Sequence, residues 1–196
     1  MRPLRGVRLG STLILADDGR LFSCGSAGSG HGHEAHDVVR PKQVQALRDV
    51  HVRGVASDYM ITLAVTAAGR VYSWGNLALL PTLEEALADE RVSMVAAGSE
   101  HACAVTEDGA LFMWGCGRYG ALGHGDEERL LSPRRVEALR GCRIATVATR
   151  RFHTLAAVED GSVYGFGISS RLGFGTISHE SQLTPKRNPN LKVRLG

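Results

Sequence analysis

The residues best suited to chemistry in this sequence are the histidines of one short stretch. His31, His33, Glu34 and His36 lie together in the run HGHEAH. Neutral imidazoles bind zinc and nickel, so His31, His33 and His36 are candidate metal ligands. A glycine-rich run of this kind is also typical of a polar, exposed loop. We favour the loop and predict no bound metal.

Two further histidines stand at equivalent places in the chain. His101 and His153 precede Gly109 and Gly161, respectively, by the same number of residues. A catalytic pair would not recur as a repeat position. We therefore interpret both as structural histidines that bond neighbouring backbone or side chains.

Motifs for covalent catalysis and phosphate binding are missing from the sequence. It holds no GxSxG elbow, and the glycine-rich runs 28–30 and 123–125 lack the Lys-Ser/Thr that follows a phosphate loop. We predict no catalytic residue, no cofactor and no enzyme activity.

An arginine-rich stretch follows in the second half of a chain whose net charge is +3. Only Glu137 opposes these arginines within their span. They form either a partner or phosphate surface, or solvated charges that blunt sheet edges. No aromatic residues interleave them, so a nucleic-acid base would have no visible stacking platform. The arginines are Arg129, Arg134, Arg135, Arg140, Arg143, Arg150 and Arg151.

The elements that must position these residues are internal repeats. Segments such as AAGRVYSWG (67–75) and EDGALFMWG (107–115) recur along the chain. Their turn glycines, Gly19, Gly69, Gly109 and Gly161, return at intervals of about 40 to 50 residues, which is typical of stacked supersecondary units. The stretch PKQVQALRDVHVRGVAS (41–57) also matches PRRVEALRGCRIATVAT (133–149) without a gap.

Each unit contains about four short β-runs, and a tight hairpin at the turn glycine joins two of them. Trp74 and Trp114 close the aromatic run in two units, and Cys24 fills the same slot in another. Four-stranded sheets of this size cannot bury their faces alone and must stack on each other, as propeller blades do. We predict one repeat domain over residues 1–196, with units 1–51, 52–91, 92–143 and 144–196.

The second unit is shorter than the others. After Trp74 it shows neither a glycine-rich loop nor a proline that matches Pro41 and Pro133. Thr82 and Glu85 have the spacing of a capping box, which predicts a short helix over Thr82 to Glu90.

The third unit carries a resemblance to a known family. VAAGSEHACAVTEDGALFMWGCGRYGALGHGD (95–126), followed by SPRRVEAL (132–139), resembles the repeat of the regulator-of-chromosome-condensation proteins. The resemblance covers most of the chain. It implies an all-β fold, a β-propeller of about four blades where the family usually has seven. The chain would then be a fragment, a propeller completed by another chain or a second copy, or an open, degenerate propeller.

The resemblance leaves three functions open. The first is a non-catalytic interaction module or scaffold that presents loops to a protein partner. The second is guanine-nucleotide exchange on a small GTPase, as the name-giving members perform. The third is nucleic-acid or ribonucleoprotein association through the arginines.

The remaining sequence features bear on location. The cysteines Cys24, Cys103, Cys116 and Cys142 fit no common zinc spacing, and we expect them to be reduced and mostly buried. No apolar run approaches the length of a membrane span. We expect an intracellular, reducing compartment, cytoplasm or nucleus rather than secretion.

Overall fold

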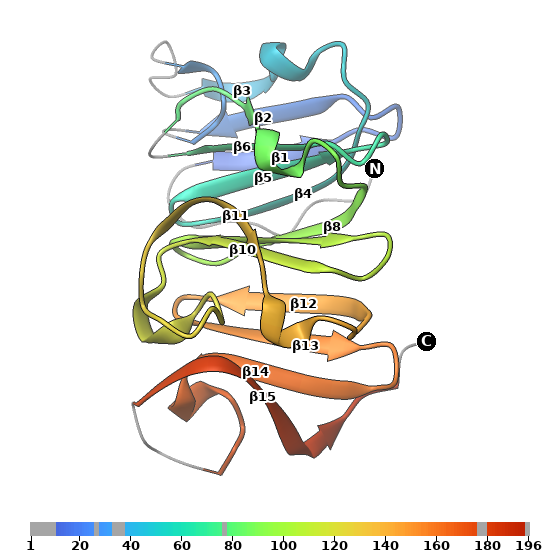
Figure 1. Ribbon diagram of the computed structural model, residues 1–196. Helices are drawn as coiled ribbons and strands as arrows, with labels where there is room; N and C mark the ends of the chain where they lie inside the picture. The colour runs from blue at the N-terminus through green and yellow to red at the C-terminus, as the bar shows by residue number, and fades with distance from the viewer. Residues whose placement is uncertain (1–10, 26–27, 33–37, 76–77, 176–179, 195–196) are drawn as a thin grey trace. The chain divides into compact units, whose positions relative to one another are not determined.

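The computed structural model describes residues 11–25, 28–32, 38–75, 78–175 and 180–194. Within these ranges the regular structure is β-strand, joined by 3-10 turns of three residues each (Figure 1). The chain divides into two compact units, Met1–Ala97 and Gly98–Gly196, and the boundary falls between the first and second strands of the third repeat.

The first unit holds two complete antiparallel meanders and one further strand. Their strand orders are β1-β2-β3 and β4-β5-β6-β7, and β8 lies against β4 and β5. The 3-10 turns η2 (Gln45–Leu47) and η3 (Glu85–Leu87) follow β3 and β7. The strands are β1 (Ser11–Leu15), β2 (Leu21–Gly25), β3 (Val38–Gln43), β4 (Val52–Asp58), β5 (Ile61–Thr66), β6 (Val71–Gly75), β7 (Thr82–Leu83) and β8 (Val92–Ala97).

The second unit continues the pattern. β9, β10 and β11 form one meander, and β12-β13-β14-β15 is a four-stranded sheet. Three 3-10 turns lie in its connections: η4 (Arg118–Gly120), η5 (Glu137–Leu139) and η6 (Ser169–Arg171). The strands are β9 (His101–Thr106), β10 (Leu111–Gly115), β11 (Leu130–Arg135), β12 (Ile144–Arg150), β13 (His153–Val158), β14 (Ser162–Ile168) and β15 (Ser181–Lys192).

The strand register repeats in every sheet. In each repeat the first residue of the second strand lies opposite a glycine at or next to the end of the third strand. These pairs are Ser11 with Gly25, Ile61 with Gly75, His101 with Gly115, and His153 with Gly167. One residue further in, Cys24, Trp74, Trp114 and Phe166 occupy a single equivalent slot.

A backbone hydrogen bond ties the turn of each of the first three sheets to the strand that begins the next repeat, and Val193, just after β15, makes the equivalent bond to the fourth turn. The turn-glycine carbonyl accepts from an amide 2.9 to 3.1 Å away. The donors are Val52 to Gly19, Val92 to Gly69, Ile144 to Gly109, and Val193 to Gly161. Sheets of this kind bury their faces against each other, and the repeated bond fixes one end of that packing.

The core of the first unit shows what the packing buries. Leu21, Leu47, Val52 and Trp74 belong to one cluster, and each is at most 2% exposed. The Trp74 indole Nε1 donates to the Gly28 carbonyl at 2.9 Å, so the one polar atom of this ring is satisfied.

The second repeat corrects the sequence analysis. Pro81 stands where Pro41 and Pro133 stand, so the matching proline is present. Three residues later, Glu84 N donates to Val71 O at 2.9 Å, as Val44 N donates to Leu21 O and Val136 N to Leu111 O. Glu84 stands where the other two repeats have a buried valine, so the proline-to-valine motif was not recognised in the sequence.

The predicted helix over Thr82 to Glu90 is wrong. Thr82 and Leu83 form β7 and pair with Ser73 and Tyr72 in β6. Only Glu85–Leu87 makes a 3-10 turn, and no side chain caps it. An α-helix from Thr82 would remove the β7 ladder, so the sheet decides the local structure.

Two further features concern location. Among the described residues, no helix is both long and apolar enough to cross a membrane. Cys103 is buried, whereas Cys24, Cys116 and Cys142 are partly exposed, so the expectation of mostly buried cysteines is wrong.

Candidate functional site

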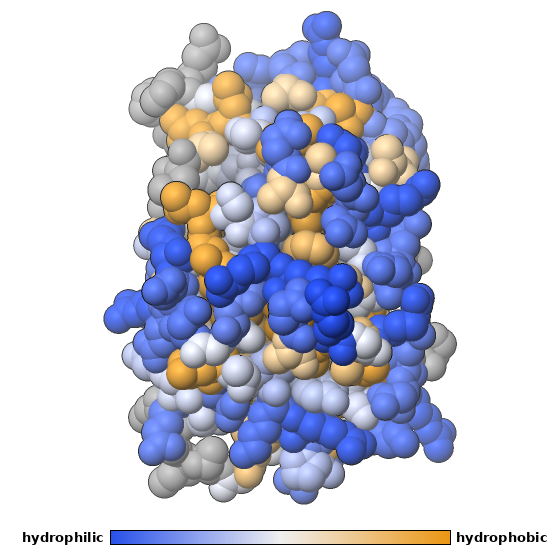
Figure 2. Space-filling view, in the orientation of Figure 1, coloured by the Kyte–Doolittle hydropathy of each residue, from blue (hydrophilic) through white to orange (hydrophobic). Residues whose placement is uncertain are grey.

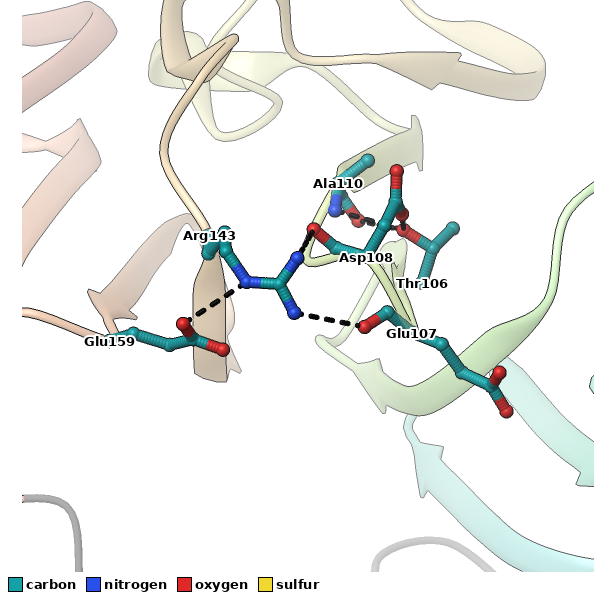
Figure 3. Close-up of polar contacts among 6 residues, drawn as sticks. All are labelled: Thr106, Glu107, Asp108, Ala110, Arg143 and Glu159. Carbon is teal, nitrogen blue, oxygen red and sulfur yellow. Dashed lines mark hydrogen bonds and ion pairs between the residues drawn. The ribbon is translucent and has the colours of Figure 1, made fainter.

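The turn of the third repeat is held by an arginine that directly precedes β12, the first strand of the following repeat. Arg143 donates through Nη1 to the Asp108 carbonyl at 2.9 Å and through Nη2 to the Glu107 carbonyl at 3.3 Å. Its Nε donates to Glu159 Oε2 at 3.1 Å, and the guanidinium lies between the two groups in Figure 3. One of the sequence-derived arginines is therefore used inside the repeat framework.

The turn aspartates serve the turns themselves. Thr106 Oγ1 donates to Asp108, and this hydrogen bond holds the pKa of the carboxyl below its usual value. The backbone amide of Ser162 likewise lowers the pKa of Asp160 by donating at 2.7 Å, and the Arg20 amide does the same for Asp18. These carboxylates stay ionised at neutral pH and are poor candidates for proton transfer.

His101 is sealed inside the second unit. It is 0% exposed, and a Cβ on Gly98 would lie 2.6 Å from its ring. Thr154 Oγ1 donates to the Ala121 carbonyl at 3.0 Å, so it must accept from His101 Nε2–H at 3.2 Å. Burial, then the charge of His153, lowers the pKa of His101 to about 4.

The neutral His101 on β9 thus hydrogen-bonds to Thr154 on β13, which in turn bonds to Ala121, just after η4. His101 Nδ1 has no hydrogen-bond partner among the described residues. His153 is only partly buried, and its pKa is lowered by burial and by Arg171 and Arg150. The structural role of the two histidines remains a prediction. The burial of His101 and its hydrogen bond to Thr154 are the reasons for it.

Of the candidate metal ligands, His31 is described, and His33 and His36 lie outside the described residues. Ser23 Oγ donates to the Ser29 carbonyl at 2.6 Å, so it accepts from His31 Nε2–H at 2.9 Å. A ring nitrogen that carries a proton cannot ligate a metal, which leaves Nδ1 of His31 for that purpose. Among the described residues, no group of three or more His, Cys, Asp or Glu side chains is arranged for a metal ion.

The sequence-derived arginines do not form one surface. Arg134 pairs with Asp126 at 3.5 Å, and Arg140 pairs with Glu137 at 2.7 Å. A hydrophilic area covers β11 and η5 on the face seen in Figure 2. Exposed pairs of this kind cancel charge and contribute little free energy.

The other sequence-derived arginines are spread over three elements. Arg129 is exposed just before β11, and Arg135 is partly buried at the end of that strand. Arg150 and Arg151 are exposed at the turn between β12 and β13.

A cavity of about 590 Å³ brings part of this set together. Arg134, Arg135, Glu137 and His124 line it, and Asp126 lies beside them. Burial lowers the pKa of His124, whose Nε2 lies 3.4 Å from the Met113 carbonyl. Both signs of charge face this cavity, so it selects neither anions nor cations by charge alone.

A second group of side chains escaped the sequence reasoning. The Phe152 ring packs against Tyr119, with ring centroids 5.2 Å apart and planes inclined by 59°. The guanidinium carbon of Arg118 lies 5.8 Å from the Phe152 centroid, and that of Arg151 lies 5.1 Å away. Arg118 and Tyr119 come from η4, whereas Arg151 and Phe152 form the β12–β13 turn, so only the fold unites them.

The stacked four-stranded units define a class of protein, the β-propellers. Two models of the Regulator of chromosome condensation (RCC1) repeat match residues 108–157 and 92–121. The first match runs from one turn into the second strand of the next repeat, across the Gly109–Ile144 hydrogen bond. The chain belongs to the RCC1-like repeat family, as the resemblance implied.

Similar proteins include the ultraviolet-B receptor UVR8 of Arabidopsis thaliana, 37% identical over 172 residues, which are 81% of this chain and 38% of UVR8. A Bos taurus secretion-regulating guanine nucleotide exchange factor is 30% identical over 206 residues, 92% of this chain and 44% of the relative. The mouse E3 ubiquitin-protein ligase HERC2 is 37% identical over 176 residues, 80% of this chain and 4% of HERC2.

Solved structures show the same fold. The crystal structure of human WBSCR16 superposes with a TM-score of 0.78 at 24% identity, over 96% of this chain and 54% of the other. Yeast RCC1 (Prp20), crystallised with Kap60, gives 0.76 at 20% identity, over 92% and 47%. The fold prediction, a β-propeller of RCC1 type with about four blades, is confirmed, and the chain spans about half of each of these propeller chains.

Proposed function

We propose that this chain is a non-catalytic β-propeller module that binds a protein partner. The observation that carries the proposal is that its reactive side chains form hydrogen bonds within the repeats. His101, Asp108 and Arg143 are each committed to the repeats through hydrogen bonds. The fold therefore explains the residues at the recurring positions. The loops and outer strands remain available to bind a partner.

The outer strands carry exposed apolar side chains. Val39 on β3 is 87% exposed and Leu131 on β11 is 78% exposed, each two residues before the repeat proline. Scattered exposed apolar residues are ordinary on protein surfaces, but these two are suited to carry a probe. A photoreactive benzoylphenylalanine at either position would leave the core untouched.

Photo-cross-linking in the source cells tests the proposal. Benzoylphenylalanine is placed singly at Val39, Leu131 and Arg150, and the tagged chain is recovered after irradiation. We expect one discrete adduct with the same protein from at least one position. Wild-type chain, irradiated without the photoreactive residue, is the control. No adduct at any position would refute a stable protein partner.

Guanine-nucleotide exchange is the second candidate, because the Bos taurus relative named as an exchange factor matches 92% of the chain. An exchange factor would stabilise the nucleotide-free state of a small GTPase. The test uses a panel of GTPases loaded with a fluorescent nucleotide. Faster release with equimolar chain would favour exchange, and unchanged release across the panel would remove it.

Two other predictions rest on weaker grounds. Nucleic-acid binding through the arginines loses support, because Arg134, Arg140 and Arg143 are paired with carboxylates. An intracellular, reducing location remains a prediction, and it follows from cysteine usage.

A further inference from the structure

We infer that the second unit carries a docking patch for an acidic segment of a protein partner. The inference rests on the proposed function and names the chemistry of that partner. The loop patch, as we call it, lies on η4, the β12–β13 turn and η6. Its residues are Arg118, Tyr119, Arg150, Arg151, Phe152 and Arg171.

The patch is an unbalanced concentration of positive charge. Arg118, Arg150, Arg151 and Arg171 are exposed, and none forms an ion pair with any residue that the structure describes. Arg150 lies opposite His153 in the β12–β13 register, and Arg171 is close enough to His153 to disfavour its protonation. The four charges therefore surround one turn.

Carboxylates of the same loops do not neutralise the patch. Glu127, in the loop that follows η4, accepts a hydrogen bond from Ser181. Elsewhere in this unit Arg134, Arg140 and Arg143 each pair with a carboxylate, whereas Arg129, Arg135 and Arg187 form no ion pair with a described residue. The patch is marked by its clustering, because four of the unpaired arginines lie together around the turn at Phe152.

The backbone under the patch is held tightly. Phe152 O accepts from Ile168 N at 2.9 Å, and a Cβ on Gly167 would lie 2.3 Å from that carbonyl. Tyr119 has φ of 60°, a left-handed conformation that costs a non-glycine residue roughly 1–2 kcal/mol. A Cβ on the next residue, Gly120, would lie 2.6 Å from Leu183 Cα.

These constraints make the patch a preorganised surface. Side chains already ordered in the free protein lose less conformational entropy when a ligand binds. Arg118 and Arg151 rest on the Phe152 ring, which limits their rotamers while their N–H groups remain available. A guanidinium held in this way matches a carboxylate with two parallel hydrogen bonds.

The Phe152 ring also discriminates between acidic protein and nucleic acid. Two guanidiniums and Tyr119 already surround it. An incoming base would have to displace a guanidinium to stack on the Phe152 ring, and single-stranded nucleic acids depend on such stacking. Clustered Asp or Glu side chains need only the guanidinium groups, so an acidic protein segment fits best.

The test measures binding of a fluorescein-labelled oligoglutamate peptide to the full chain by fluorescence anisotropy. Arg118→Gln with Arg151→Gln should weaken binding by roughly tenfold or more, because two charge-assisted contacts are lost. The matched control is Arg134→Gln with Arg140→Gln, which removes equal charge from paired sites and should change affinity by less than about twofold.

A second variant separates the two parallel hydrogen bonds of a guanidinium from its charge. Arg118→Lys with Arg151→Lys keeps both charges, so the salt dependence should persist while affinity falls several-fold. Thermal unfolding of every variant shows whether the fold is retained. Equal losses in the patch and control variants would overturn the patch, as would tight binding of an oligouridylate RNA in place of the peptide.

Failure of this inference can be told apart from failure of the proposed function. The Gln patch variant, with benzoylphenylalanine at Leu131, enters the cross-linking experiment. A partner adduct as strong as that of the same probe in the wild-type background overturns the acidic-segment patch and leaves the interaction module standing. Loss of the adduct in the Gln patch variant, while the Arg134→Gln, Arg140→Gln control still cross-links, supports both the acidic-segment patch and the interaction module.

Discussion

Replacing Gly109 by alanine should lower the free energy of unfolding more than the same replacement at a turn where a Cβ meets no neighbouring atom. Gly109 has φ of +85°, and a Cβ there would lie 2.7 Å from Arg143 Cα and 3.0 Å from Ile144 N. Its carbonyl accepts the Ile144 amide at 2.9 Å, which is the bond between one turn and the next repeat.

The size of the effect follows from two contributions. The left-handed backbone costs an alanine about 1–2 kcal/mol. Overlap with backbone atoms that cannot swing away adds about 1–3 kcal/mol, including a weakened Ile144 hydrogen bond. The free energy of unfolding should therefore fall by about 2–5 kcal/mol, a large share of the stability of an ordinary domain.

Gly141 supplies a matched control in the same unit. It also has φ of +85°, but nothing lies within 4 Å of the position that a Cβ would take there. Gly141→Ala should therefore cost only the backbone contribution of about 1–2 kcal/mol. Urea unfolding, followed by Trp fluorescence and circular dichroism, measures both variants. Equal losses for the two would refute the claim that the turn glycine holds successive repeats together.

Three further predictions concern stability measured by urea unfolding. His101 is neutral when folded, with a pKa of about 4, so the free energy of unfolding should fall by up to about 3 kcal/mol as pH drops from 6.5 to 4. His101→Gln should show a smaller fall, and an unchanged pH profile would contradict this. Arg143→Gln should cost about 1 kcal/mol, against less than about 0.5 for the exposed pair removed by Arg140→Gln; equal costs would show that the carbonyl contacts are dispensable. Glu84→Val should stabilise by about 1 kcal/mol at pH 7, because burial raises the pKa of Glu84 and penalises its charge. The gain should shrink as acid protonates the wild-type carboxyl, and a gain independent of pH would exclude this cause.

The fold was predictable because the strongest signals recur. Turn glycines, closing aromatics and the proline motif each mark the same place in several units, and the register of the strands reproduces that alignment. The second repeat misled the sequence reasoning at one residue: Glu84 stands in a slot that Val44 and Val136 fill. Local charge there favoured an exposed helix, whereas the β6–β7 ladder fixes an outer strand.

The candidate sites were less accessible to sequence reasoning. A run of arginines shows its charge but not its partners. Asp126 and Glu159, which pair with Arg134 and Arg143, lie outside the arginine-rich stretch 129–151. Arg118 and Phe152 belong to loops of different repeats, so nothing in their spacing predicts that they meet. The sequence RRFH (150–153), at the turn before a repeat histidine, was the one local hint that aromatic and basic residues share a loop.

The central claim is that this chain works as a binding module with a fixed protein partner. Native mass spectrometry of the chain, isolated gently from its source, tests it most directly. The account predicts one complex of constant stoichiometry, heavier than the 21.0 kDa chain, that contains a second protein. A single species at the mass of the chain alone, under conditions that preserve other complexes from the same cells, would contradict it.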